Sequence, residues 1–143
     1  MTPRPIGYWL KHLDGLIERQ LDVTLADAGL SRRHWQVLNL LKDQPAARQA
    51  VAAALAPFWD EAGSDLAAVL DGPDGLVARD LVAVDAAGTL SLTAAGQAAR
   101  GAAATRVEVQ RRALLEGLTP AHYAETVRVL SVMAANAERM LAR

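Results

Sequence analysis

Residues 81–96 read LVAVDAAGTLSLTAAG, two short apolar runs that flank a glycine-bearing turn and are followed by a helix start. Residues 81–84 and 89–92 have the composition of short β-strands, and the turn at residues 85–88 between them predicts a hairpin. Thr93 is a good N-cap for a helix that begins at Ala94. Because a lone hairpin is only marginally stable, we expect this one to pack on helices.

The sequence before this hairpin starts with a long amphipathic helix. Pro5 suits the first position of a helix, and Gly29 suits its end. Between them an apolar stripe recurs with helical spacing. Its members are Ile6, Trp9, Leu10, Leu13, Ile17, Leu21 and Leu25.

Three shorter helices are predicted between the first helix and the hairpin. Ser31 caps the second helix. The third covers roughly residues 46–59, with Pro57 near its end, where proline finishes or kinks a helix. Ser64 is a possible cap for the fourth helix, which the glycines and proline of residues 71–75 interrupt.

Two long helices follow the hairpin. The fifth runs from Ala94 to about Gly117, and Thr119 with Pro120 begins the last one. Apolar residues of the last helix alternate in steps of four and three, the spacing of a helix-pairing seam. They are Tyr123, Val127, Leu130, Ala134, Ala137 and Leu141. Such apolar helices exceed what one small chain can bury, which predicts a symmetric homodimer.

Composition restricts the class of protein. The 143 residues suit one domain, and 52% of them are hydrophobic. The chain has no cysteine, which excludes disulfides, cysteine-ligated zinc and thiol redox sensing. No signal peptide and no uninterrupted apolar run of about 18 residues is present, so we expect a cytoplasmic protein without a membrane segment. No phosphate loop, nucleophile elbow or paired carboxylates are recognisable, so no catalytic residue is predicted.

The order of helix, helix, helix, helix, hairpin and two long helices resembles the MarR family of ligand-responsive regulators over nearly the whole chain. Residues 6–10, 30–38, 75–79 and 90–96 carry the resemblance. It implies a mostly α fold, a single winged helix-turn-helix domain over residues 1–143. The winged lobe would span approximately residues 31–93, and the dimerisation helices approximately residues 5–28 and 94–142. It also implies a homodimer that binds double-stranded DNA, with a small-molecule effector between lobe and dimer region.

The charge distribution departs from what DNA binding requires. Residues 1–56 carry a net charge of +2 and residues 91–143 a net charge of +3, whereas residues 57–90 carry −6. That middle region holds Arg79 alone against seven carboxylates, although it should contain the recognition helix and the wing. Each acid that faces a phosphate adds repulsion. The residues predicted to contact DNA are Arg32, Arg33, Arg48, Ser64 and Arg79.

The resemblance places a ligand crevice along the first two helices. Trp9 and His12 lie on the first helix, and His34, Trp35 and Asn39 lie on the second. Together they would form an aromatic pocket with polar handles. The alternative is that both tryptophans belong to the core and that the histidines face solvent or pack without a ligand.

Phe58 and Trp59 form a second aromatic pair. They are expected to anchor the third helix on the core, and an exposed Trp59 would instead indicate a ligand or partner contact. No histidine pair has metal-binding spacing, so no metal and no cofactor are predicted. A haem with His12 or His34 as its axial ligand is compatible with the sequence, but nothing requires it.

Three functions remain open from sequence alone. The first is a ligand-responsive DNA-binding transcriptional regulator. The second is a small-molecule-binding protein or enzyme on the same scaffold that has lost DNA binding, which the acidic region favours. The third is a protein-binding winged helix whose acidic face meets a basic partner.

Overall fold

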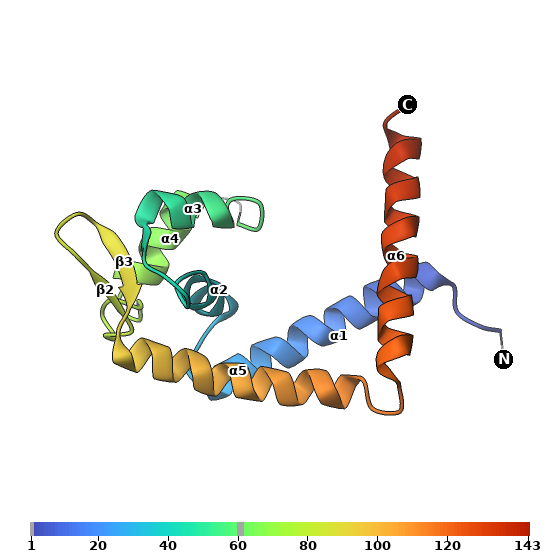
Figure 1. Cartoon of the computed structure of the whole chain (residues 1–143), viewed down its shortest axis with the longest axis horizontal. Helices are drawn as coiled ribbons and strands as arrows, with labels where there is room; N and C mark the ends of the chain where they lie inside the picture. Colours follow the sequence, from blue (N-terminus) through green and yellow to red (C-terminus); the bar gives the residue numbers. More distant parts are fainter. Residues whose placement is uncertain (1, 60–61) are drawn as a thin grey trace. The chain divides into compact units, whose positions relative to one another are not determined.

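The computed structural model describes residues 2–59 and 62–143, and it is mostly helical, as predicted. The chain forms two compact units, Met1–Val107 and Glu108–Arg143. In chain order the elements are α1 (Ile6–Asp27), α2 (Arg32–Leu40), β1 (Ala46–Ala47), α3 (Arg48–Leu55), α4 (Ala62–Asp71), β2 (Val82–Val84), β3 (Thr89–Leu92), α5 (Ala94–Leu114) and α6 (Pro120–Leu141) (Figure 1).

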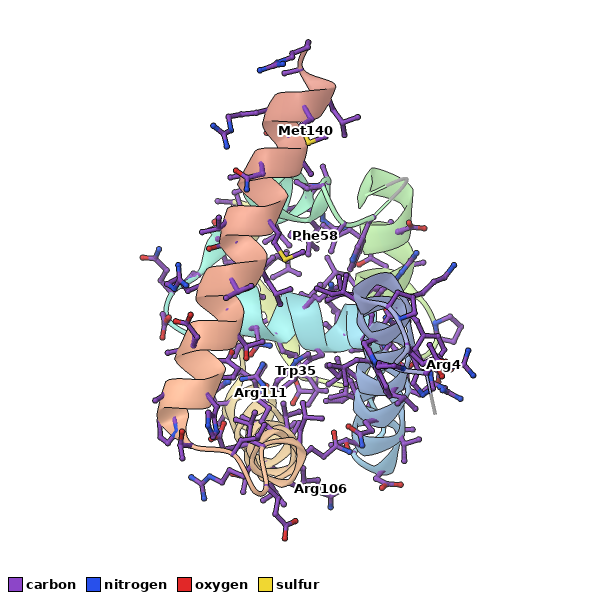
Figure 2. The ribbon with its side chains drawn as sticks, turned by 90° about the vertical axis from the view of Figure 1, so that its right-hand side faces the viewer. Arg4, Trp35, Phe58, Arg106, Arg111 and Met140 are labelled. Atoms are coloured by element: carbon purple, nitrogen blue, oxygen red, sulfur yellow. The ribbon has the colours of Figure 1, made fainter. Side chains whose placement is uncertain are left out.

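The core of the first unit is built around α2. This helix lies between the first part of α5 on one side and the pair α3 and α4 on the other (Figures 1 and 2). Buried side chains from all these elements pack into one cluster. Its fully buried larger members are Leu25, Val37, Leu38, Leu41, Val51, Leu66, Leu70, Leu76, Val82 and Leu90.

The predicted caps of α2, α5 and α6 are confirmed. The Ser31 hydroxyl accepts a hydrogen bond from the His34 backbone N–H, and His34 Nδ1 accepts one from the Ser31 backbone N–H, both at 3.1 Å. This reciprocal arrangement is a capping box. The Thr93 hydroxyl accepts from the Gly96 N–H at 2.9 Å at the start of α5. Thr119 and His122 form a second capping box at the start of α6.

The predicted hairpin is also confirmed, and it belongs to a larger sheet than expected. β2 and β3 pair antiparallel, and β1 pairs with the other edge of β3, so the strand order is β1-β3-β2. Ala46 lies opposite Leu90 and Ala47 opposite Thr89. The sheet therefore ties the start of α3 to the wing.

The start of α5 passes very close to the wing. A Cβ atom placed on Gly96 would lie 2.0 Å from the carbonyl oxygen of Leu81. The same oxygen accepts a hydrogen bond from the Thr93 N–H at 3.1 Å, so its position is fixed. Only glycine fits at this crossing.

Three helix boundaries differ from the prediction. α3 covers Arg48–Leu55 instead of residues 46–59, because Ala46 and Ala47 join the sheet and the helix ends before Pro57. α4 begins at Ala62, so Ser64 lies within its first turn and does not cap it. α5 ends at Leu114, before a turn in which Gly117 has a φ of 83°.

Candidate functional site

A pocket opens between α2 and the end of α3. Its volume is about 310 Å³, at the small end of the range for ligand sites. Figure 2 labels Trp35 of α2 and Phe58, which follows α3. The lining residues are Trp35, Gln36, Asn39, Leu40, Ala54, Leu55 and Phe58. The walls are therefore mostly apolar, with two side-chain amides as polar groups.

Both amides are held by donors outside the pocket lining. Gln36 Oε1 accepts a hydrogen bond from Trp59 Nε1 at 2.6 Å, and Asn39 Oδ1 accepts one from Arg100 Nη1 at 3.3 Å. An indole N–H and a guanidinium can only donate, so the amide atoms that face them must be oxygens. The orientation of each amide is thereby fixed.

Phe58 and Trp59, the aromatic pair after α3, have different roles. Trp59 is 5% exposed and belongs to the core, which agrees with the anchoring role expected for the pair. Phe58 is 74% exposed and forms part of the pocket rim. Phe58 therefore does not anchor α3, because its neighbour fills that place.

The structure brings two of the five predicted ligand residues together. Trp35 and Asn39 line the pocket, whereas His34 is engaged in the cap of α2. His12 stacks on Tyr8 with ring centroids 5.4 Å apart. Trp9 lines a separate hollow beside residues 2–5.

Gln36 and Phe58 were missed as pocket residues by the reasoning from sequence. A signal for Gln36 exists in the sequence, since positions 35, 36, 39 and 40 share one face of a helix. Nothing local distinguishes Phe58 from Trp59. Their roles depend on which ring reaches Gln36.

His34 is poised to report on pH through the α2 cap. Burial lowers its pKa below the usual value, the positive charge of Arg79 lowers it further, and Asp74 opposes both. Its Nδ1 must also be unprotonated to accept from the Ser31 N–H. Folding therefore favours the neutral imidazole.

We expect the stability of the chain to fall as the pH drops below 6.5, the ordinary pKa of histidine, because the unfolded chain takes up a proton that folded His34 resists. The contribution of neutral His34 to the free energy of unfolding is fully present above pH 6.5. It is lost as the pH falls from there through the lower pKa that His34 has in the folded state. His34→Gln should reduce this dependence, since glutamine can complete the capping box. Urea titrations over this pH range compare the two proteins. Identical pH profiles would contradict the assignment.

Two of the predicted DNA-contacting arginines are tied to α4. Arg48 holds Asp71 through two hydrogen bonds of 3.0 and 3.2 Å. Arg33 pairs with Asp65 at 3.0 Å and lies over the ring of Trp59, 5.1 Å from its centroid. Two of the acids that make residues 57–90 negative, Asp65 and Asp71, are therefore paired with arginines.

The other two arginines have partners outside the lobe, on α1 and in the turn that follows it. Arg32 pairs with Asp22 at 2.8 Å and with Glu18 at 3.5 Å. Arg79 donates to the carbonyl oxygen of Gly29 at 2.8 Å. Ser64 lies on α4, but its side chain is outside the part that the structure describes.

The acid at the tip of the wing builds the turn. Asp85 Oδ1 accepts from the backbone N–H groups of Ala87 at 2.9 Å and of Thr89 at 2.8 Å. This is the turn-forming role that aspartate commonly has. The carboxylate at this place is thus explained by local structure.

Neither a metal centre nor a membrane span is found in the described residues. Within residues 2–59 and 62–143, no three histidine or acidic side chains come together as metal ligands would. No described helix combines the length and the apolar character needed to cross a bilayer. The features that can act chemically are the pocket and the lobe formed by α3, α4 and the wing.

Comparison with solved structures identifies the fold of the chain. No family model and no curated protein matches the sequence. Solved structures do match. The chain is similar to CouR from Rhodococcus jostii RHA1 bound to p-coumaroyl-CoA, with a TM-score of 0.68 and 23% identity, over 91% of each chain. The chain has the MarR fold.

Two further structures support this assignment. The MarR family protein Rv2887 of Mycobacterium tuberculosis in complex with DNA gives a TM-score of 0.67 at 20% identity, over 92% of this chain and 98% of that one. The oxidized form of MarR from E. coli gives 0.64 at 17% identity, over 93% and 96%. The MarR fold predicted from the order of the elements is confirmed.

Proposed function

We propose that the chain is a cytoplasmic, homodimeric transcriptional regulator that binds double-stranded DNA and responds to a small molecule. The observation that supports this most is the lobe itself, in which α3 and α4 are followed by the β2–β3 hairpin and β1, directly before α3, completes the three-stranded sheet. A helix pair of this kind places its second helix in the major groove. Among the similar structures, Rv2887 is in complex with DNA and CouR is described as a transcriptional repressor.

The paired arginines are compatible with this function on energetic grounds. The side chains of Arg33 and Arg48 are 48% and 40% exposed. Exposed ion pairs contribute only about 0–1 kcal/mol, so exchanging a carboxylate for a phosphate costs little. The carboxylates of Asp65 and Asp71 remain close by, however, and they repel the phosphates of the DNA backbone. We therefore expect weak affinity and a shallow salt dependence relative to the number of arginines.

A chain of contacts connects the pocket to α4. Gln36 lines the pocket and accepts a hydrogen bond from Trp59 Nε1. The guanidinium of Arg33 lies over the ring of Trp59. Arg33 in turn pairs with Asp65 in the first turn of α4. A ligand that moves Gln36 would shift this series and with it the recognition helix. The ligand would thereby favour one arrangement of the lobe over another.

The dimer is proposed from the surface of α1. Its apolar stripe remains largely exposed in the single chain. The exposed members are Ile6, Trp9, Leu10, Leu13 and Ile17. A continuous apolar stripe on a long helix marks an interaction surface, and a second copy would cover it symmetrically.

Gel-shift titration with the DNA that flanks its own gene tests the function. We expect salt-sensitive binding by the wild type. Ala68→Glu should weaken it at least about tenfold, because Ala68 is exposed on α4 and a carboxylate there faces the duplex. Asp71→Asn should strengthen binding, because it removes a charge and releases Arg48.

The matched control is Ala98→Glu, which adds the same charge at an exposed position of α5. It should bind DNA as the wild type does. Absence of salt-sensitive binding to any fragment from the locus would overturn the proposal. The chain would then be a small-molecule-binding protein that has lost DNA binding.

A further inference from the structure

A junction of four residues joins the end of α1, the start of α2 and the segment that follows α4: Gly29, Ser31, His34 and Arg79. His34 and Ser31 form the capping box of α2, with both hydrogen bonds at 3.1 Å. Arg79 Nη1 donates to the carbonyl oxygen of Gly29 at 2.8 Å, in the turn between α1 and α2. A Cβ atom placed on Gly29 would lie 3.3 Å from Arg79 Nη2, so the guanidinium lies directly against this turn.

The segment that carries Arg79 is bonded to the elements proposed to bind DNA. The backbone N–H of Leu76 donates to the carbonyl oxygen of Val69 in α4 at 2.8 Å, and the N–H of Leu81 donates to that of Leu76 at 2.9 Å. β2 of the wing begins at the next residue, Val82. A displacement of this segment at the junction therefore reaches both α4 and the wing.

The charges that act on His34 come from the segment after α4. Arg79 disfavours a positive charge on the partly buried imidazole, and Asp74 favours one. The turn at residues 28–31 holds no charged side chain. Neighbouring charged side chains of α2 are engaged in ion pairs with α1 and α4: Arg32 with Asp22 and Glu18, and Arg33 with Asp65.

Protonation of His34 would act on both contacts of the junction. A protonated imidazole donates from both ring nitrogens, so Nδ1 no longer accepts from the Ser31 N–H. Two N–H groups then face each other, and the capping box opens. The new positive charge also repels the guanidinium of Arg79, which ties the segment after α4 to Gly29. Both effects loosen the junction.

We propose that His34 is a proton-operated switch of DNA binding, in which the neutral imidazole keeps the junction closed and the protonated imidazole opens it. The proposal rests on the proposed function, and it adds acid as a signal that acts outside the pocket, since His34 does not line it. Two lobes must keep a fixed spacing to enter successive major grooves. A loosened junction between α1 and each lobe has to be ordered again on binding, which costs affinity.

DNA titrations between about pH 7.5 and about pH 5, on either side of the ordinary pKa of histidine, test the switch. We expect the affinity of the wild type to fall at least about fivefold towards the lower pH, a coupling within the usual range for two linked sites. Acidification adds positive charge to the rest of the chain, which by itself favours DNA binding. A loss of affinity therefore has the opposite sign to the general effect of charge.

A matched pair of histidines supplies the variant and its control. His122 forms the same capping box with Thr119, with both hydrogen bonds at 3.1 Å, but it lies on α6 in the other compact unit. Glutamine can complete either box. His34→Gln should therefore keep its affinity for DNA at the lower pH, whereas His122→Gln should lose affinity as the wild type does. Circular dichroism at each pH ensures that only folded protein is compared.

Two charge variants are expected to move the midpoint in opposite directions. Arg79→Gln removes the charge that disfavours protonation, so the midpoint should rise, and Asp74→Asn removes the charge that favours it, so the midpoint should fall. The ring-proton NMR resonance of His34 reports the same midpoint directly. Because coupling is reciprocal, bound DNA should lower the pKa of His34.

The outcomes separate the switch from the regulatory function. Affinity that falls in the wild type and in His122→Gln, but not in His34→Gln, supports the proposal. Parallel pH profiles in all three proteins overturn the switch and leave the regulatory function intact. If the chain binds no DNA, the proposed function fails by itself, and hydrogen exchange of the free protein at the lower pH decides about the junction. Faster exchange of residues 29–34 and 79–82 in the wild type than in His34→Gln supports it, and equal exchange overturns it.

Discussion

Replacing Gly96 with alanine is expected to destabilise the chain by about 3 kcal/mol, the upper part of the range for forcing an atom into a filled site. The new Cβ would lie 2.0 Å from the carbonyl oxygen of Leu81 and 3.0 Å from its carbonyl carbon. Backbone atoms cannot rotate away as a side chain can. The start of α5 or the end of the wing would have to move, and the hydrogen bond from Thr93 to Leu81 would be strained or lost.

Gly101→Ala is the matched control, because it lies in the same helix. A Cβ there meets no atom within 4 Å. Alanine is about 0.5–1 kcal/mol better than glycine inside a helix, so this variant should be more stable than the wild type. Chemical denaturation of the three proteins gives the free energies of unfolding. Equal stability of the two alanine variants would show that the close approach at Gly96 does not exist in solution.

The change Leu13→Glu is expected to convert the proposed dimer into monomers at micromolar concentration. Leu13 is 43% exposed in the middle of the apolar stripe of α1. In a two-fold symmetric interface one substitution places two carboxylates in the contact, each of which loses water without gaining a partner. We expect the dimer dissociation constant to rise at least about a hundredfold.

Sedimentation equilibrium measures this directly. Ala26→Glu is the control, since it adds one carboxylate at an exposed position on the polar side of the same helix. It should leave the dimer intact. A wild type that is monomeric at micromolar concentration, or a Leu13→Glu protein that remains dimeric, would contradict the dimer surface assigned to α1.

Features set by neighbouring residues were predictable from sequence. Ser31 and Thr93 cap helices through residues three positions later, and both caps exist as predicted. Asp85 also acts locally, and its turn-forming role could have been recognised from its position before the glycine-bearing turn. In each case the physical cause lies within four residues of the side chain.

Features set by distant residues were not predictable. β1 consists of two alanines, which have little strand propensity, and it exists because the free edge of β3 lies beside it. Arg48 and Asp71 are 23 residues apart, so charge counting could not pair them. The division of roles between Phe58 and Trp59 likewise depends on Gln36, which reaches only one of the two rings.

The pairing of β1 with β3 has a mechanical consequence. Ala47 is bonded into the sheet and is followed directly by Arg48, the first residue of α3. No flexible linker separates the wing from that helix. In the proposed complex with DNA, a duplex that displaced the hairpin would therefore also displace α3 through the sheet. Duplexes already bent to fit both elements would bind at a smaller cost of deformation.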